Sequence, residues 1–159
     1  MADIIADGRT RAGWITTIAN IAAPTVAELN AGILLQTTLT PAGLKGLQPT
    51  TAKIDASSLA SRITLQRNGR TSIADSMLEF KKQDGTDTIY DTLLFGTAGY
   101  LVVRTSILET VAWTIGHKVR VYPMECGEVA HVDIEENTLE RYQIPLTLTG
   151  QWNLRATVA

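Results

Sequence analysis

Apolar and polar residues alternate along much of this chain, and a period of two is the spacing of β-strands. The alternation is clearest near the C-terminus, from Arg141 to Thr149 and again, after Gly150, from Trp152 to Val158. Because neighbouring side chains of a strand point to opposite faces, each stretch places one apolar row against a core. We therefore expect two half-buried strands joined by a tight turn.

The same pattern predicts strands in the middle of the chain. Val111, Trp113 and Ile115 alternate with polar or small residues, and beyond a turn Val119 and Val121 continue the pattern, which indicates a hairpin. The apolar pairs that predict further strand cores are Ile63/Leu65, Leu78/Phe80, Leu101/Val103 and Val132/Ile134. Roughly eight to ten strands result, so we expect a mainly β fold, a mostly antiparallel sandwich or partial barrel.

Two short segments carry the signals of helix ends. Thr25 with Glu28 predicts a capping box for the first helix, which Gly32 would end in a left-handed conformation. Thr86 or Asp87 would cap the second. Two such helices cannot supply the crossovers that parallel strands need, so we expect them to flank an antiparallel sheet.

Residues 39–59 differ from the rest of what we expect to be one domain spanning residues 1–159. This segment carries two prolines, two glycines and many small polar residues. It is predicted to be a long loop or a loosely formed hairpin. Loops of this length in compact domains usually have a function or order on binding, so we favour an assembly element over simple disorder.

Charge is sparse and unevenly placed. Charged residues make up 19% of the chain, below the roughly 25% typical of soluble domains, which suggests surface buried against partners. Glu125–Glu140 contains six acids and no Lys or Arg, while the whole chain has a net charge of −2. No basic cluster favours tight nucleic-acid binding. The acids either form a solvated turn or repel DNA phosphates inside a conduit, and both interpretations stay open.

The group that most resembles a catalytic site is His131, Asp133 and Glu135. A strand would place these three side chains on one face, with about 6.5–7 Å between neighbours. Such a face could bind a metal. The simpler interpretation is the solvent side of a strand whose Val132 and Ile134 pack inward. The chain has no phosphate-binding loop, nucleophile elbow or zinc-protease motif, and its single cysteine excludes an intrachain disulfide. We expect no enzymatic activity, cofactor or metal.

Four stretches of the chain carry a family resemblance. They are APTVAELNAG (residues 23–32), TIYDTLLFGTAGYLVVR (88–104), VRVYPMECGEV (119–129) and YQIPLTLTG (142–150). In them the chain resembles the major tail tube proteins of siphophages, the long-tailed bacteriophages. The resemblance implies a β-sandwich with a flanking helix, whose hexameric rings stack into a tube that carries DNA from the capsid to the host.

The resemblance also implies partners and a location. The partners are further copies of the chain, with the tape measure, terminator and distal tail proteins, while DNA passes through without specific binding. The location is the virion tail after synthesis in the host cytoplasm, and no membrane association is expected. The candidates for residues facing the bore are Asp133, Glu135, Thr147 and Thr149. The candidates for contacts between rings are Leu44, Lys45, Leu47 and Lys53.

Two other functions compete with a tube subunit. One is a tail terminator or head–tail connector, which would form rings without extending them. The other is a β-sandwich module that binds a carbohydrate or cell-surface ligand, which would need an exposed aromatic platform. Trp14, Trp113 and Trp152 mostly fall on the apolar phase of predicted strands, which favours core positions for them.

Overall fold

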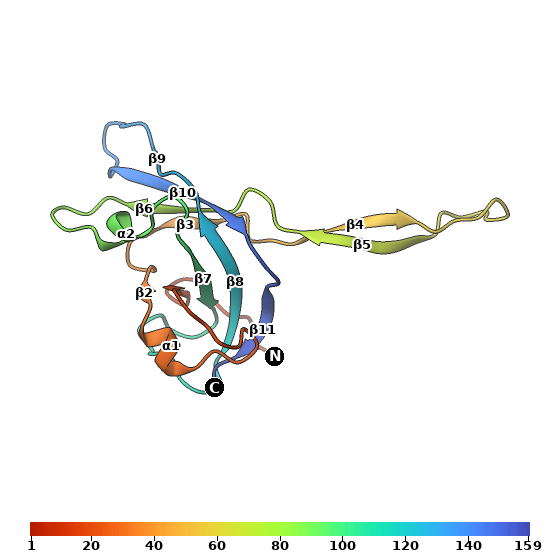
Figure 1. The fold of residues 1–159 in the computed structure, drawn as a ribbon, viewed down its shortest axis with the longest axis horizontal. Helices are drawn as coiled ribbons and strands as arrows, with labels where there is room; N and C mark the ends of the chain where they lie inside the picture. The colour runs from red at the N-terminus through yellow and green to blue at the C-terminus, as the bar shows by residue number, and fades with distance from the viewer.

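The computed structural model describes residues 1–159, which form eleven strands and two short helices (Figure 1). The strands are β1 (Arg11–Ile15), β2 (Ile33–Leu34), β3 (Leu39–Lys45), β4 (Thr50–Asp55), β5 (Gln66–Ser72), β6 (Met77–Lys81), β7 (Ala98–Arg104), β8 (Lys118–Cys126), β9 (Ala130–His131), β10 (Arg141–Leu148) and β11 (Asn153–Thr157). The helices are α1 (Val26–Asn30) and α2 (Thr88–Thr92). The predicted mainly β fold with two flanking helices is confirmed, and neither helix is long and apolar enough to cross a membrane.

Nine strands form one curled antiparallel sheet in the order β2-β1-β7-β8-β10-β6-β3, with β9 beside β10 and β11 beside β8. β10 pairs with β8 at Met124–Cys126, and β11 pairs with the same strand at Lys118–Val121. Both predicted C-terminal strands are therefore present, and they follow one another along β8 without pairing with each other. A register shift between Asn153 and Ala156 breaks the alternation of β11, which leaves Leu154 exposed.

Two hydrophobic cores lie on opposite faces of β7 and β8. Leu101 and Val103 of β7 pack into the larger core, whereas Val102 between them packs into the smaller one. The larger core lies between β1-β7-β8 and the layer of β10, β6 and β3, and α2 adds Ile89 and Leu93 to it. Fully burying such a side chain contributes roughly 1.5–3 kcal/mol, so this core holds the two layers together.

The smaller core is covered by α1, and the predicted capping box at its start is present. The Glu28 N–H donates to the Thr25 hydroxyl at 3.2 Å, and the Thr25 N–H donates to the Glu28 carboxylate at 2.8 Å. The prediction for Gly32 is wrong, because its φ is not positive. A Cβ there would collide with Ile15 Cδ1 and would lie 2.6 Å from Trp14 O, so Gly32 is needed for close packing.

Helix α2 begins at Asp87, one of the two predicted caps. The Asp87 carboxylate accepts the N–H of Tyr90 at 3.1 Å and that of Gln83 at 3.1 Å, and the Tyr142 hydroxyl donates to it at 3.3 Å. Burial, together with the charge of Asp87, raises the pKa of Tyr142 above its ordinary value. This carboxylate therefore fixes both the start of α2 and its contact with β10.

The hairpin predicted around residues 111–121 is absent, because its first half forms an irregular loop around Arg104. The Arg104 guanidinium is fully buried and donates to the carbonyl oxygens of Val111 at 2.7 Å and Ala112 at 3.1 Å. Residues 105–117 contain no strand. Trp113 is buried beside Arg104, but Ile115 is exposed.

Two of the four predicted strand cores are wrong and two are confirmed. β9 ends at His131, so Val132 and Ile134 lie in a loop, where Ile134 is 88% exposed. The pair Ile63/Leu65 precedes β5 and is also exposed. Leu78/Phe80 and Leu101/Val103 do form strand cores. The two confirmed pairs are those that pack into the larger core.

Candidate assembly surfaces

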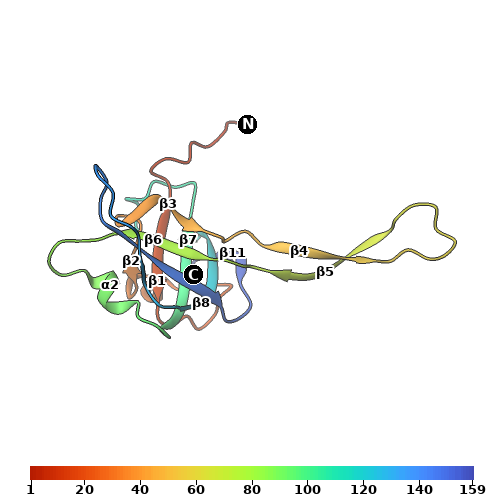
Figure 2. The ribbon, with the colours of Figure 1, turned by 90° about the horizontal axis from the view of Figure 1, so that it is seen from above.

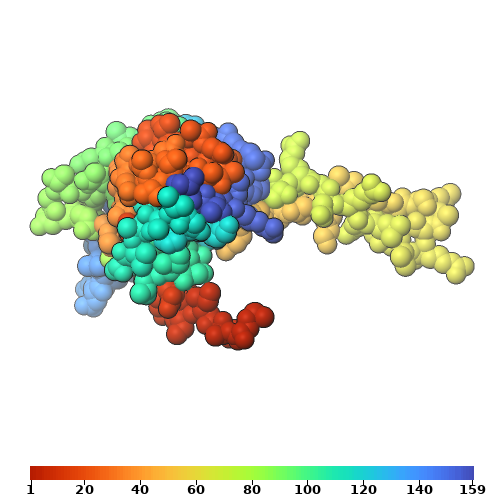
Figure 3. All heavy atoms as spheres, turned by 90° about the horizontal axis from the view of Figure 1, so that it is seen from below, coloured from red at the N-terminus to blue at the C-terminus, as the bar shows by residue number.

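The most prominent surface is a hairpin that projects far from the body (Figures 1 and 2). It consists of β4, the loop 56–65 and β5, and we call residues 50–72 the arm. β4 and β5 pair only with each other, and none of the arm's side chains is buried. Figure 3 shows the arm reaching well beyond the rounded body. The arm therefore offers both faces to a partner.

The prediction for residues 39–59 is corrected by the path of the chain into the arm. Residues 39–45 form β3 of the body, where Leu39 and Leu44 pack against the larger core. Residues 50–59 contribute β4 and the start of the arm's loop, and the partner strand β5 lies beyond the predicted segment. The sequence alone could not place β5, because the residues of this strand are polar and show no alternation of apolar and polar side chains.

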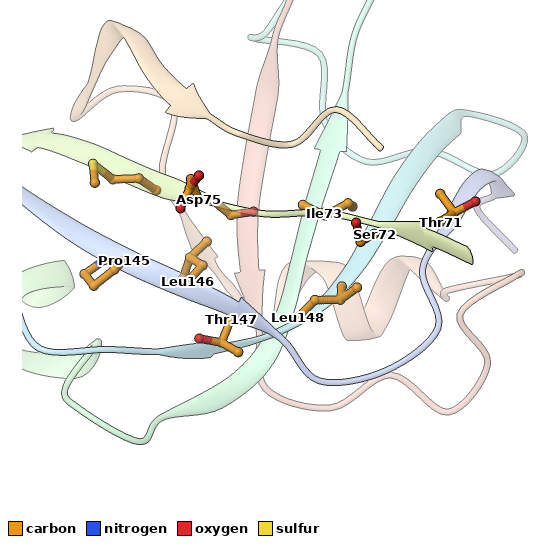
Figure 4. Close-up of a pocket in the computed structure, with 10 residues that line it drawn as sticks. Thr71, Ser72, Ile73, Asp75, Pro145, Leu146, Thr147 and Leu148 are labelled. Carbon is orange, nitrogen blue, oxygen red and sulfur yellow. The ribbon is translucent and has the colours of Figure 1, made fainter. Parts of the chain in front are cut away.

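A close backbone contact between Gly46 and residues 75–76 fixes the direction in which the arm leaves the body. Gly46 and Asp75 both have positive φ, +70° and 55°, and the buried Ser76 donates its hydroxyl to Gly46 O at 2.9 Å. A Cβ on Gly46 would collide with Asp75 O, so only glycine fits there. Beside this contact β10 and residues 71–77 diverge, and they leave a groove lined by Ile73 and Leu148 among others (Figure 4).

A second surface is the face of β3, β6 and β10 that points away from the larger core. Its centre is Glu79, which is only 5% exposed. The four groups that donate to its carboxylate are Gln143 at 2.7 Å, Thr40 at 3.0 Å, Lys45 at 3.3 Å and Arg141 at 3.3 Å. The Gln143 bond, followed by those of Thr40 and Lys45, holds the pKa of Glu79 below its ordinary value. One carboxylate thus ties three strands together.

This network predicts a stability difference that depends on pH. Because the folded-state pKa of Glu79 lies below its ordinary value of 4.5, its contribution is complete above that value and is lost as the pH falls through the folded pKa. We expect Glu79→Gln to lower the free energy of unfolding by about 1–3 kcal/mol at pH 7. Urea unfolding between pH 7 and pH 2 should show the two proteins converging in acid. Glu128→Gln, on an exposed side chain, is the control, and a deficit that persists in acid would contradict the assignment.

A third surface is the loop Val132–Glu140 between β9 and β10, which we call the acidic loop. Apart from Val132, which is half-buried, all its residues are exposed. Asp133 and Glu135 lie in this loop, so they do not share a strand face with His131 as the alternation predicted. No group of three or more His, Cys, Asp or Glu side chains lies close enough to hold a metal ion. His131 contacts the Tyr90 hydroxyl at 3.2 Å.

Comparison with known proteins assigns the family of a chain with these surfaces. The family model described as "Phage tail tube protein" matches residues 1–159. The chain belongs to the phage tail tube protein family. The predicted family is therefore confirmed, and the tail tube protein is a structural component of a phage tail. No curated protein sequence matches it.

A solved structure shares the fold of this tail tube protein. It is a chain in the cryo-EM structure of the anti-feeding prophage baseplate, six-fold symmetrised. The two chains are 10% identical, the likeness covers 98% of each, and the TM-score is 0.65. Because the identity is low, the likeness supports the fold alone, which is the curled antiparallel sheet.

The candidates for contacts between rings lie in two different parts of the tail tube protein. Leu44 of β3 and Leu47, just beyond it, are half-buried against the larger core, and Lys45 binds Glu79. Lys53 lies on the arm and is exposed. Of the four, Lys53 is the one that makes no contact with the body, and Lys45 keeps 42% of its side chain exposed beside Glu79.

The candidates for residues facing the bore also lie in different parts of the molecule. Asp133 and Glu135 lie in the acidic loop, whereas Thr147 of β10 is exposed on the same face as Gln143. Thr149 follows β10 and is exposed. The sequence did not single out Glu79, since one glutamate in the apolar run of β6 resembles an interruption of the strand pattern. That placement of an acid between Leu78 and Phe80 was the one available signal.

Proposed function

We propose that this tail tube protein forms hexameric rings that stack into a tube, through which DNA passes from the capsid to the host. The observation that carries the proposal is the arm, which projects from the body without covering any part of its own chain. A hairpin of two strands is at best marginally stable in water, so it needs a partner surface. In a tail tube protein the available partner is another copy.

The layer of β9, β10, β6 and β3 supports ring closure. β3 is the last strand on one side of the sheet, and an uncovered edge is a template for pairing with a second chain. Six copies of a four-stranded layer, with strands about 4.8 Å apart and tilted by about 40°, close into a wall about 48 Å across. Such a wall leaves a bore wider than a DNA double helix. The six-fold symmetry named for the similar baseplate structure favours the same number.

The polar face around Glu79 suits the lining of such a bore. Glu79 partly neutralises Lys45 and Arg141, and Glu125 lies beside Thr147 on the same face in the β8–β10 pairing. Mixed charges do not create the continuous positive field that binds phosphates tightly. DNA could therefore slide along this face without specific binding. Thr147 remains our candidate for the bore from the sequence, joined now by Gln143.

The arm supports stacking of one ring on the next. An arm that reaches a different surface of its neighbour makes a head-to-tail contact, which repeats until another protein ends it. Growth of this kind requires a terminator at one end and distal tail proteins at the other, and a tape measure to set the length. These are the partners that we propose beside the chain itself.

Electron microscopy of the purified protein tests the proposal. We expect negative-stain images to show tubes of uniform diameter, with end-on views that have six-fold symmetry. A protein that remains monomeric at high concentration would contradict both rings and tubes. Rings that close but never stack would instead identify a terminator or connector, because such proteins cap a tail without extending it.

A further inference from the structure

The arm carries chemistry that restricts what can cover it. Apolar side chains gather toward its tip, where Leu59 is fully exposed and Ile63 is 70% exposed. Ile54 of β4 is also exposed, and its pairing with Arg67 of β5 places both side chains on one face of the hairpin. A surface that covers the arm must therefore combine apolar contacts with groups that accept a cation.

The charge of the arm points to an acidic partner. The charged residues of the arm are Lys53, Asp55, Arg62, Arg67 and Arg70, which give four positive charges against one negative charge. No salt bridge within the chain involves any of them. A net charge of +3 on an arm that touches no acid of the body favours a negatively charged docking surface.

The acidic loop has the complementary composition. Its acids are Asp133, Glu135, Glu136 and Glu140, and it has no Lys or Arg. Between these acids lie two exposed apolar side chains, Ile134 and Leu139, which is 67% exposed. The loop thus pairs a net charge of −4 with apolar surface that nothing in the chain covers.

We propose that the arm of one copy docks on the acidic loop of a copy in the adjacent ring. The inference rests on the proposed function, since it names the surface that receives the arm. The arm and the acidic loop project from opposite ends of the molecule (Figures 1 and 2). They cannot meet within one chain, but they can meet between copies arranged head to tail, and that contact repeats in every ring.

The N-terminal segment, residues 1–8, is the competing receiver within the chain. It has two acids, Asp3 and Asp7, beside the exposed Ile4 and Ile5. It carries half the acids of the acidic loop, and Arg9 follows it directly. The acidic loop is therefore the better match to the arm, and the N-terminal segment provides a control of the same chemical kind.

A charge-swap experiment tests the contact. The arm variant is Arg67→Glu/Arg70→Glu and the loop variant is Asp133→Lys/Glu135→Lys. Each alone is expected to lower the fraction of protein that sediments as tubes at least about tenfold, because each places like charges in contact. The protein with all four substitutions restores opposite charges, so its sedimenting fraction is expected to recover to within about threefold of the unmodified protein.

The control variant Asp3→Lys/Asp7→Lys is expected to sediment like the unmodified protein. If the loop variant assembles normally while the unmodified protein forms tubes, the docking inference is wrong and the proposed function stands. If the N-terminal variant blocks assembly and the loop variant does not, the receiver is the N-terminal segment and the inference is again wrong. If the unmodified protein forms no tubes, the proposed function and the inference both fail.

Disulfide trapping gives a second measurement that does not depend on charge. Ser57→Cys places a thiol near the tip of the arm, and Thr138→Cys places one on the acidic loop. The natural Cys126 will not compete, because burial raises the pKa of its thiol to about 12. Tubes of the double variant are expected to give a ladder of disulfide-linked chains after mild oxidation. Monomers alone from intact tubes would overturn the inference.

Discussion

Replacing residues 52–70 by an Asn-Gly turn is expected to abolish tube formation and to leave the body folded. Thr51 and Thr71 are paired directly across the arm, with their hydroxyl oxygens 3.0 Å apart, so a two-residue turn can join them. The deleted part buries no side chain. Electron microscopy and sedimentation are expected to find only monomers or single rings at concentrations where the unmodified protein forms tubes.

The thermal midpoint and the circular dichroism of the body measure whether that variant is folded. Because the arm adds nothing to either core, we expect the free energy of unfolding to change by no more than about 0.5 kcal/mol. Removing Leu39–Lys45 is the contrasting deletion, since it takes β3 out of the main sheet and should unfold the protein. Tubes formed by the arm-deleted protein, or its unfolding, would contradict the role of the arm.

Arg104→Met is expected to cause the largest loss of stability of any single substitution considered for this protein. The guanidinium donates to Leu108 O at 2.9 Å, in addition to its bonds to residues 111 and 112. Burial and the charge of Arg104 lower the pKa of His117, so its ring stays neutral and its Nδ1, 3.2 Å from Arg104, can accept a hydrogen bond. Losing these part-buried bonds leaves four acceptors without their donor, which costs about 3–5 kcal/mol in total.

Urea unfolding followed by tryptophan fluorescence measures this loss, because Trp113 packs beside the guanidinium. Arg104→Lys keeps the charge but cannot reach all the carbonyl oxygens, so its free energy of unfolding should lie between those of the other two proteins. Arg62→Met, on the exposed arm, is the control and should change stability by less than about 0.5 kcal/mol. An unchanged midpoint for Arg104→Met would show that the loop 105–117 is held by other contacts.

Local sequence determined the parts of this protein that depend on near neighbours. The capping box of α1 joins residues three positions apart, and the Asp87 cap of α2 reaches Tyr90 over the same distance. The alternation in β6, β7 and β10 was sufficient to predict strands, because each strand has one apolar face on the larger core. These features predicted the fold class and supported the family resemblance.

Only the tertiary structure decided which alternating segments became strands. Residues 111–115 and 132–134 have apolar spacing like that of β7, yet both form loops. Trp113 packs into the smaller core from a loop whose carbonyl oxygens bind Arg104, and Ile134 is exposed. In β5 the reverse holds, because a polar segment became a strand through pairing with β4 alone.

The candidate surfaces depended on distant contacts in the same way. The four donors around Glu79 lie 34, 39, 62 and 64 positions away in the chain, so no local pattern could bring them together. The arm's direction is set where Gly46 meets Asp75, nearly thirty residues further along the chain. The sequence by itself determined the strands with one apolar face and the helix caps. The fold decided which charges meet and which hairpin stays uncovered, because those contacts join residues that only the folded chain brings together.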